Sequence, residues 1–479
     1  MNLIVILVLF FAVIENTSSH DLNEQAAGAE DYHREDEIDG KLRYLPEFNV
    51  NADVTNKWSK YIELVQNANR QFISTADNDK ATSPALANAT CAPFLPLVES
   101  DLKYYEDLHG AQFIDENFIS TADNDKATSP ALANATCAPF LPLVESDLKY
   151  YEDLHGAQFI DENVIEQMKK LDRTVHYQIV NHRLYRDKAC MFPSRCSGVE
   201  HFLLFLLPHL PNMDLFVNVR DYPQIGKSFP KGQQLPVFSF SKDVTSYVDI
   251  TYPAWTFWSG GPALDIYPTG IGRWDLSRES ILRKQSQLPW SKKADIAFFR
   301  GSRTSAQRDP IIRLSRAQPH LVDAKYTKNQ AWKSKEDTLG EEPAGTVPFE
   351  EHCQYKYLFN AQGVAASFRL KHLFLCRSLV LNVHSEWIEF FYPPLKPWIH
   401  YVPISADFAD TTEVLHFLAE NQPIAARIAK RGFEFIRQHL TMEAVQCYWR
   451  YLLEAYSSRL VAHRPSVPDQ KLIEITQSA

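Results

Sequence analysis

Residues 214–223, Asp-Leu-Phe-Val-Asn-Val-Arg-Asp-Tyr-Pro, decide the fold class of this chain. Their first six residues form a short apolar run of the kind found in buried strands, and two charged residues follow at once. From Val164 onward such runs alternate with helical stretches, which is typical of parallel α/β units. Ligands of parallel sheets bind at the carboxyl ends of the strands. We therefore expect chemistry at Arg220 and Asp221.

The rest of this region repeats the pattern. We expect strands at 235–240, 295–299, 321–323 and 379–383, and helices at 308–316, 370–376, 412–440 and 442–460. Two loops that contain Gly, Ser and Arg, 300–305 and 363–369, each lead into a helix. Small residues allow close approach of a backbone to a ligand, and a helix start supplies N–H donors with partial positive charge. With Arg308 and Arg369 nearby, these loops predict a nucleotide diphosphate site, and tight packing of the small residues is the alternative interpretation.

Asp221 is the best candidate for a general base. A carboxylate at the end of a strand, between Arg220 and the aromatic Tyr222, can be ionised and partly desolvated, as a base requires. The simpler interpretation is an aspartate that starts a turn before Pro223. None of the 16 histidines lies in a recognisable Ser-His-Asp or Cys-His context.

The composition and the N-terminal residues limit the classes of protein to which this chain can belong. The chain has 479 residues, 45% of them hydrophobic, and a formal charge of −10, so it is globular and has no overall basic field for a nucleic-acid partner. The apolar run Leu3–Ile14 is too short to span a bilayer but suits the core of a signal peptide over residues 1–19. No other stretch predicts a transmembrane segment, because Pro208 interrupts the run 199–207.

Residues Phe72–Asn117 recur without change as Phe118–Asn163. Stacked structural repeats diverge in sequence, so two identical 46-residue copies indicate a recent duplication or a gene-model artefact rather than a solenoid. One core has room for one copy, so we expect one to dock and the other to bulge out. Each copy carries an N-glycosylation acceptor, Asn88 and Asn134. Each also carries Asp-Asn-Asp, at 77–79 and 123–125, which we interpret as solvated turns rather than metal sites.

The seven cysteines fit an oxidising compartment. Cys190 and Cys196 bracket a short loop that contains proline, and we expect a local disulfide there. Cys353 and Cys376 form the next candidate pair. Cys447 then remains for Cys91 or Cys137, the duplicated cysteine. Zinc is not predicted, because no Cys-x-x-Cys or paired histidines occur.

Six motifs carry a resemblance to a known family. They are Cys190-Met-Phe-Pro-Ser-Arg-Cys-Ser-Gly-Val-Glu-His-Phe202, Asn218-Val-Arg-Asp-Tyr-Pro223, Tyr252-Pro-Ala-Trp-Thr-Phe-Trp258, Tyr267-Pro-Thr-Gly-Ile-Gly-Arg-Trp-Asp275, Phe299-Arg-Gly-Ser-Arg-Thr-Ser305 and Val364-Ala-Ala-Ser-Phe-Arg369. In this order they closely resemble the Rumi-like protein O-glucosyltransferase family. The resemblance covers residues from Val164 to about Leu460.

The resemblance implies an α/β fold of the GT-B type, with two Rossmann-like lobes facing a cleft and helices at the C-terminus. It implies an inverting, metal-independent transfer of glucose from UDP-glucose to the serine of Cys-x-Ser-x-(Pro/Ala)-Cys in folded EGF-like domains such as those of Notch. Some members also transfer xylose from UDP-xylose. The expected protein is a monomer of the endoplasmic reticulum lumen, although residues 477–479 form no retrieval signal.

The family's functional residues map onto this chain. Asp221 becomes the catalytic base. The donor-binding positions are Arg273, Ser302, Arg308, Val364, Ala365, Ala366, Ser367, Phe368 and Arg369. The acceptor-contacting positions are Met191, Phe192, Pro193, Ser194, Arg195, Arg220, Pro268, Thr269, Gly270, Ile271, Gly272, Arg273 and Trp274.

The copy that adjoins the matched region enters Val164 with native spacing, so we expect Cys137 to pair with Cys447. The expected division is a signal peptide (1–19), an N-terminal extension (20–71), the duplication (72–163), an acceptor lobe (164–290), a nucleotide-sugar lobe (291–440) and a C-terminal helix and tail (441–479). Two alternatives remain open. One is a non-catalytic lumenal binder or chaperone of EGF-like domains, and the other is a transferase for xylose or another sugar.

Overall fold

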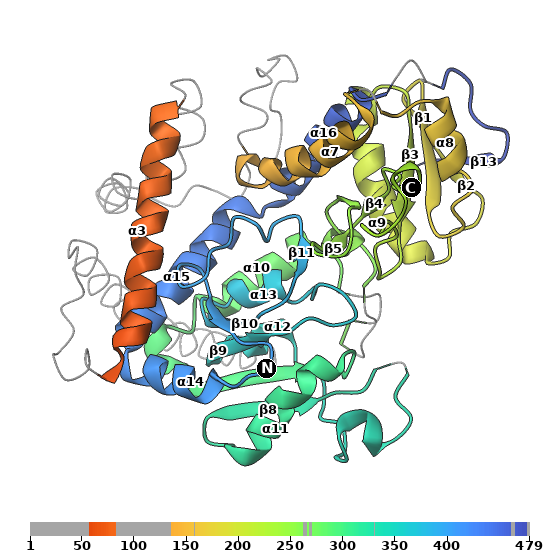
Figure 1. Ribbon diagram of the computed structural model, residues 1–479. Helices are drawn as coiled ribbons and strands as arrows, with labels where there is room; N and C mark the ends of the chain where they lie inside the picture. Colours follow the sequence, from red (N-terminus) through yellow and green to blue (C-terminus); the bar gives the residue numbers. More distant parts are fainter. Residues whose placement is uncertain are drawn as a thin grey trace, which may run out of the picture.

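The computed structural model describes residues 57–82, 136–157, 159–261, 266–267, 271–329, 331–460 and 465–476, with the side chains of 73–82 excepted. The expected signal peptide, both glycosylation acceptors and Cys91 lie outside these residues. The described chain is a mixed α/β structure with two main sheets, which we call the first and second lobes (Figure 1).

The first lobe is built on a six-stranded sheet in the order β13-β2-β1-β3-β4-β6. Its strands are β1 (Val175–Val180), β2 (Arg183–Asp187), β3 (Met213–Asn218), β4 (Phe238–Ser239), β6 (Ile250–Thr251) and β13 (Leu472–Ile475). Only β3, β4 and β6 run parallel, and β13, β2, β1 and β3 pair antiparallel. The expectation of parallel α/β units throughout is therefore wrong for this half of the sheet. The turn at Asn181 and His182 joins β1 directly to β2 as a hairpin, without a crossover helix.

The second lobe is built on a five-stranded parallel sheet in the order β12-β10-β9-β7-β8. Its strands are β7 (Ala294–Gly301), β8 (Val322–Tyr326), β9 (Tyr355–Asn360), β10 (Leu379–Val383) and β12 (Val402–Ile404). The chain goes from β7 to β8 on one side and then crosses to β9 on the other. The strand order therefore reverses between β7 and β9, where ligands of open α/β sheets bind.

Helices cover both lobes. They are α8 (Glu162–Met168), α9 (Pro193–Leu206), α10 (Trp274–Gln285), α11 (Asp309–Ala317), α12 (Phe349–His352), α13 (Leu370–Phe374), α14 (Thr411–Glu420) and α15 (Gln422–His439). The single helix expected at 412–440 is two helices, because Asn421 leaves the helical conformation and Pro423 follows in the first turn of α15. The strand expected at 235–240 shortens to the two residues of β4.

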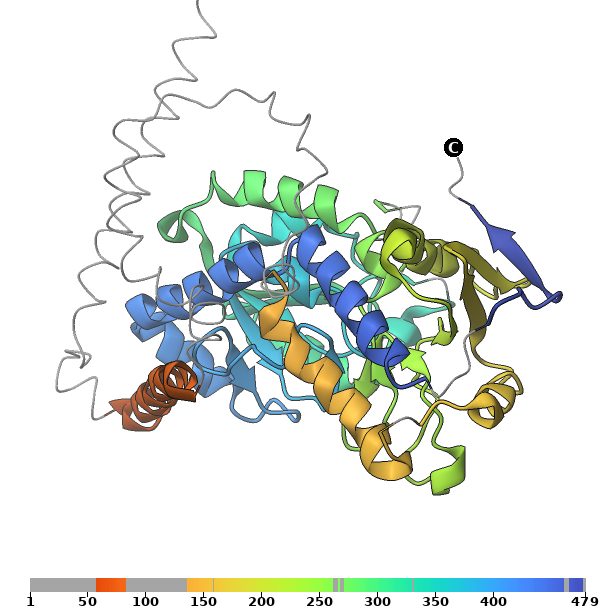
Figure 2. The same cartoon turned by 90° about the horizontal axis from the view of Figure 1, so that it is seen from above.

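Two structures join the lobes. A two-stranded antiparallel sheet pairs β5 (Ser241–Asp243), which follows β4, with β11 (Trp387–Glu389) of the second half of the chain. Helix α16 (Met442–Ser457) leaves the second lobe and lies beside α7 (Leu141–His155), as both Figures 1 and 2 show. The Cys137–Cys447 disulfide ties the start of α7 to α16.

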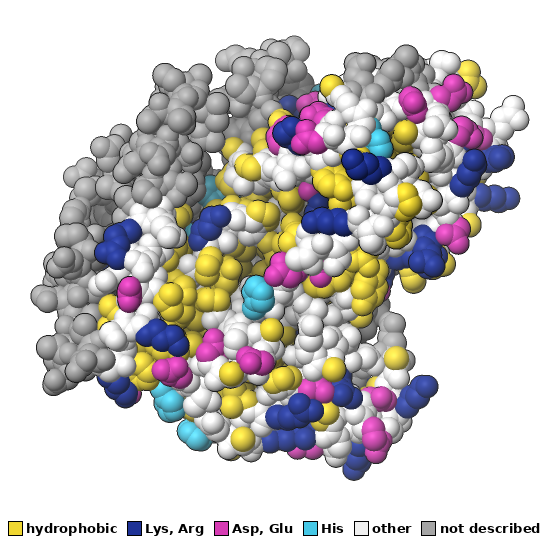
Figure 3. Space-filling view, in the orientation of Figure 1, with side chains coloured by type: hydrophobic (Ala, Val, Ile, Leu, Met, Phe, Trp, Pro, Cys, Tyr) yellow, Lys and Arg dark blue, Asp and Glu magenta, His cyan; other side chains and the backbone are white. Residues whose placement is uncertain are grey.

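All three expected disulfides are present: Cys137–Cys447, Cys190–Cys196 and Cys353–Cys376. Three disulfides in one chain are consistent with the secretory pathway. Among the described residues, no helix combines the length and apolar character that a bilayer crossing requires. Figure 3 shows one face of the molecule, on which basic and acidic side chains are mixed over the described surface without a single basic field.

The duplication contributes described residues from both copies. Helix α3 (Ser59–Thr82) runs into the first copy, and the Phe72 ring lies 5.9 Å from the ring of His400. The second copy is described from Thr136 onward and supplies Cys137 and α7. The described residues of the duplication therefore come from the start of the first copy and the end of the second, and the docking of a single copy stays a prediction. Residues 77–79 are helical rather than a turn, because α3 continues through them.

Candidate active site

Asp221 lies directly after β3, on a loop whose backbone is held from two sides. The Asn218 side chain accepts from the Arg220 amide (2.8 Å) and donates to the Tyr222 carbonyl (2.7 Å). The buried Asp249 carboxylate accepts from the amides of Gln224 and Ile225, which follow in the same loop. Burial raises the pKa of Asp249 to about 6, while these hydrogen bonds act in the opposite direction. The loop is thus fixed by its neighbours while the Asp221 side chain stays 44% exposed.

The Asp221 carboxylate forms an ion pair with Arg195, at 3.1 Å. Arg195 comes from the first turns of α9 and also donates to the carbonyl of Val219 (2.8 Å). Its guanidinium lies over the rings of Phe192 (4.3 Å) and Trp255 (4.6 Å). Sequence reasoning placed Arg195 among acceptor contacts and did not predict this pair. The geometry orients the carboxylate and leaves one side of it open to an incoming group.

The cystine loop before α9 presents apolar side chains beside Asp221. Met191 is 59% exposed and Phe192 is 36% exposed, next to the Cys190–Cys196 disulfide. Ser194 sits behind them, where its carbonyl lies 3.3 Å from the position that a Cβ on Gly260 would take. Gly260 has φ of +79°, so glycine meets both the backbone conformation and the close approach there. The expected acceptor residues of this loop and Arg220 therefore gather at the edge that carries Asp221.

The second expected acceptor stretch, 268–274, is placed only in part. Pro268, Thr269 and Gly270 lie outside the described residues. The side chains of Ile271 and Trp274 are buried, and the Trp274 indole donates to the Leu440 carbonyl at 2.8 Å, so it belongs to the core rather than to an acceptor surface. Arg273 pairs with Asp275 (2.7 Å) and lies 4.4 Å over the Trp258 ring. Gly272 lies against the backbone of Trp258 and Ser259, too close for any side chain.

The second lobe brings the expected donor residues together at the reversal point between β7 and β9. Arg308 is buried and donates to three carbonyls: Ser302 after β7, and Ala361 and Gln362 after β9. It therefore cross-links the two loops rather than extending into solvent. Burial lowers the pKa of Arg308 to about 10, so the guanidinium is charged at neutral pH.

Arg369 lies beside Arg308 in the same place. Its guanidinium packs directly on Gly301, where a Cβ would overlap it, and donates to the carbonyl of Arg300 at 2.7 Å. Burial, and then the neighbouring charge of Arg308, lower the pKa of Arg369. Neither arginine pairs with a carboxylate of the described residues within 4 Å. Two adjacent cations, one buried and one half-buried, without an acidic partner indicate a site for an external anion.

The loop 364–369 borders these arginines. Val364 is exposed, whereas Ala365, Ala366 and Ser367 are buried, and the Phe368 ring packs on Phe240 of the first lobe (5.0 Å). The helix that follows, α13, has five residues rather than the expected seven. A helix this short supplies little macrodipole. The buried arginines, rather than the helix, must then supply most of the positive charge.

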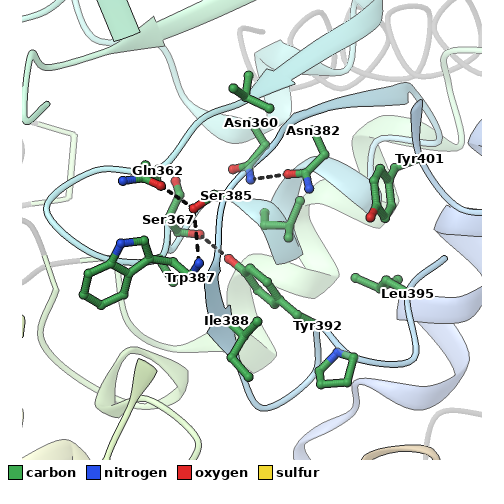
Figure 4. Close-up of a pocket in the computed structure, with 14 residues that line it drawn as sticks. Asn360, Gln362, Ser367, Asn382, Ser385, Trp387, Ile388, Tyr392, Leu395 and Tyr401 are labelled. Carbon is green, nitrogen blue, oxygen red and sulfur yellow. Dashed lines mark hydrogen bonds between the residues drawn. The ribbon is translucent and has the colours of Figure 1, made fainter. Parts of the chain in front are cut away.

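A cavity of about 210 Å³ opens beside this loop, at the carboxyl ends of β9 and β10 (Figure 4). Polar and aromatic side chains line it, among them Asn360, Gln362, Ser367, Asn382, Trp387 and Tyr392. Asn360 donates to Asn382 (2.7 Å), and the Tyr392 hydroxyl donates to the Ser367 carbonyl (3.3 Å). Trp387 also contacts the Tyr222 ring next to Asp221, with centroids 5.7 Å apart. Sequence reasoning missed this cavity, because its side chains come from four separate segments.

The described residues contain no group of three or more His, Cys, Asp or Glu side chains placed to hold a metal ion. The groups described above that can act chemically are an oriented, accessible carboxylate on one lobe and a cationic site on the other.

Comparisons with known proteins identify the family. Residues 132–478 match the family model of Glycosyl transferase family 90. The chain is 60% identical over 288 residues to Protein O-glucosyltransferase 1 of Rattus norvegicus, covering 60% of this chain and 72% of the relative. It is 59% identical over 286 residues to the Homo sapiens protein of that name, with coverage of 60% and 72%. It is 57% identical over 314 residues to the O-glucosyltransferase rumi homolog of Aedes aegypti, with coverage of 65% and 77%.

Proposed function

The chain belongs to glycosyl transferase family 90, and from this membership we propose that it moves glucose from UDP-glucose to a serine hydroxyl of a folded EGF-like domain. The relatives are named protein O-glucosyltransferases, so the activity is protein O-glucosylation. The acceptor serine lies in Cys-x-Ser-x-(Pro/Ala)-Cys, as in the EGF-like domains of Notch. The binding of the UDP-sugar is supported by Arg308 and Arg369, which lie side by side and have no described carboxylate partner.

Asp221 is the proposed base. It removes the proton of the serine hydroxyl as the serine oxygen attacks the anomeric carbon from the face opposite the diphosphate. The bond from the anomeric carbon to the phosphate oxygen breaks, its electron pair leaves with UDP, and the configuration inverts. One carboxylate suffices for this step, and proton transfer of this kind contributes ~10²–10⁴ in rate. Arg195 holds the carboxylate in one orientation (3.1 Å) and its exposed side faces the acceptor.

The leaving diphosphate gains negative charge as the bond breaks. Arg308, Arg369, Ser302 and the loop 364–369 form its proposed binding site, with Arg273 reaching from the first lobe. Fixed cations in a water-poor site stabilise developing charge without needing to reorganise. The mechanism requires no metal, so adding EDTA should leave the transfer rate unchanged, and strict dependence on a divalent cation would contradict it.

The proposed acceptor surface comprises the cystine loop, with Arg220 and Arg273. A loop tightened by a disulfide presents its apolar side chains at low entropic cost to another small disulfide-bonded domain. We further propose that the two lobes form a GT-B enzyme, with acceptor lobe 164–290 and donor lobe 291–440, acting as a monomer in the endoplasmic reticulum lumen. The mixed α/β architecture, with two parallel-rich regions meeting at β5 and β11, supports this assignment.

The decisive experiment is mass spectrometry of a folded EGF-like domain incubated with the purified chain and UDP-glucose or UDP-xylose. A gain of one hexose from UDP-glucose is expected, located on the consensus serine. A gain of one pentose alone would identify a xylosyltransferase. No gain with either donor, together with retained binding of the EGF-like domain, would identify a non-catalytic binder.

A further inference from the structure

Two opposite charges lie inside the core where the lobes meet. Lys371 of α13 and Glu389 of β11 each have no exposed surface. Burying an ionised lysine or glutamate is costly unless it gains a partner, so such residues are rare in cores. Burial raises the pKa of Glu389 and lowers that of Lys371, and each charge opposes the shift of the other. The two groups therefore act on each other across the core.

Lys371 contacts both lobes. Its ammonium lies 3.2 Å from the carbonyl of Phe368, in the donor loop, and 3.3 Å from the hydroxyl of Thr256, in the first lobe. It also lies 4.7 Å over the ring of Phe257, next to Thr256. The neighbouring Trp255 ring lies under Arg195, the partner of Asp221. One side chain thus joins the loop proposed for the diphosphate to the segment that supports the proposed base.

Glu389 completes this arrangement from a third side. Glu389 lies opposite Ser241 in the antiparallel pairing of β11 with β5 between the lobes. Its carbonyl accepts from the amide of Tyr392 (3.0 Å), and the Tyr392 hydroxyl donates to the carbonyl of Ser367. Two successive carbonyls of the donor loop, Ser367 and Phe368, are therefore held by side chains next to Glu389. Neither Glu389 oxygen has a hydrogen-bond partner among the described residues, and its carboxylate forms no ion pair with Lys371 within 4 Å, although the charge of Lys371 opposes the effect of burial on the pKa of Glu389.

We propose that Lys371 and Glu389 are positioning residues for glycosyl transfer, a buried pair that fixes the donor loop against the first lobe so that diphosphate and base stay in register. The proposal rests on the transferase function above. Small displacements of a reacting group reduce rates steeply, of order 10²-fold for ~1 Å, so a rigid link between the lobes has a direct kinetic effect.

Stability alone does not account for the pair. Replacing a buried ion pair by neutral residues of similar shape is often neutral or stabilising, whereas removing one partner is strongly destabilising. A purely structural pair could therefore be replaced without effect on catalysis. The double variant Lys371→Met/Glu389→Gln keeps the shape of both side chains and removes both charges, so it separates the two roles.

The test compares this double variant with the wild type by thermal unfolding, by calorimetric binding of UDP and by steady-state transfer to an EGF-like domain. We expect the melting temperature to stay the same or rise. We expect kcat to fall about tenfold or more and UDP binding to weaken severalfold, with the acceptor KM within twofold. A double variant that folds like the wild type and keeps kcat and donor KM within twofold would overturn the proposal.

A matched control exists in the first lobe. Lys242 and Asp147 form a buried ion pair (2.5 Å) whose other hydrogen bonds join the backbone of Asp249 and Thr251 rather than the donor loop. The double variant Lys242→Met/Asp147→Asn should leave kcat and donor KM unchanged, and an equal loss of kcat in both double variants would also overturn the proposal. If Lys371→Met/Glu389→Gln fails to fold, Thr256→Val decides. It removes only the interlobe hydroxyl, and unchanged kcat would refute the positioning role. A wild type without transfer refutes the transferase function instead.

Discussion

The two lobes present charge to the active site in opposite ways. At the edge of the first lobe, Asp221 is exposed and paired with Arg195, on a loop fixed by Asn218 and Asp249. At the edge of the second lobe, Arg308 is buried, Arg369 is half-buried, and neither pairs with a described carboxylate. A paired, accessible charge suits a group that must gain a proton at each turnover. Unpaired, buried cations suit a site that an anionic ligand completes.

The difference also predicts that substitutions at the two edges affect different steps of the reaction. The first edge depends on a carboxylate that takes up a proton during transfer, whereas the second depends on guanidiniums that bind an anion. Changes at the first edge should affect the chemical step and its pH dependence. Changes at the second should affect donor binding.

The largest expected effect is that of Asp221→Asn. The amide keeps the shape and can still contact Arg195, but it cannot take a proton, so kcat should fall by ~10²–10⁴. UDP and acceptor binding should stay within severalfold of the wild type by calorimetry. Asp153→Asn, which alters another exposed aspartate paired with a basic residue (Lys149, 2.7 Å), serves as the control and should leave kcat unchanged. A rate for Asp221→Asn above a tenth of normal would place the base elsewhere.

Arg308→Ala tests the second edge. Loss of a charged partner of a buried phosphate is worth ~1.5–3 kcal/mol, so the Kd for UDP should rise about 10–100-fold while the acceptor KM stays within twofold. Arg313→Ala removes an exposed arginine of α11, the helix that begins directly after Arg308, and should leave UDP binding unchanged. Because Arg308 also holds three carbonyls, the melting temperature should be measured with and without UDP. An equal rise on adding UDP in wild type and Arg308→Ala would contradict a phosphate role.

The sequence predicted where the functional loops lie better than it predicted the contacts that their residues make. Asp221 at the end of β3 and the strands of the second lobe were readable because each follows from a local apolar run. The burial of Trp274 and the carbonyl contacts of Arg308 depend on segments more than 50 residues away, which no local pattern encodes. The antiparallel half of the first sheet was missed for two reasons: β13 joins it from the far end of the chain, and the β1–β2 hairpin turns at Asn181 and His182 without a glycine or proline to signal it.

Lys371 and Glu389 left a signal that sequence reasoning did not use. Each is a charged residue within a run that is otherwise mostly apolar or aromatic, Phe368–Leu375 and Trp387–Tyr392. Such a residue is either on the surface of an amphipathic element or buried with a partner. Only the packed structure distinguishes these cases, because it brings the two runs together.

A smaller effect is expected from pH on the loop behind Asp221. The folded pKa of Asp249 is about 6, above its usual value of 3.8, so the folded state binds more protons than the unfolded state between these values. The contribution of Asp249 to stability is therefore complete below pH ~4 and falls as pH rises through 6, by on the order of 2–3 kcal/mol. Urea unfolding of wild type and Asp249→Asn from pH 4 to 7 should show the wild type losing stability relative to the variant. Parallel pH profiles would contradict the raised pKa.

Residues 83–135 connect α3, which packs on the second lobe, to the segment of α7, which packs on the first. The two copies are identical, so deleting Phe72–Asn117 gives the same chain as deleting Ser83–Thr128. Seven residues then join Thr82 to Thr136 in place of 53, a reach of up to ~25 Å. A shorter connection costs less closure entropy, by on the order of 1–2 kcal/mol. Transfer activity should stay within twofold and the melting temperature should stay the same or rise, whereas loss of folding would show that both copies are required.

The smallest effect is expected from Cys91→Ser, which tests which copy anchors the first lobe to α16. Peptide mapping cannot answer this, because trypsin releases the same peptide, Ala-Thr-Ser-Pro through Asp-Leu-Lys, from residues 81–103 and 127–149. Substitution can. The structure joins Cys447 to Cys137, so Cys91→Ser should leave the melting temperature and the transfer rate unchanged. Cys137→Ser, its counterpart in the other copy, should lose ~2–4 kcal/mol of stability by opening that link. The reverse result, with Cys91→Ser destabilised and Cys137→Ser unchanged, would assign the link to the first copy and with it the docking of α7.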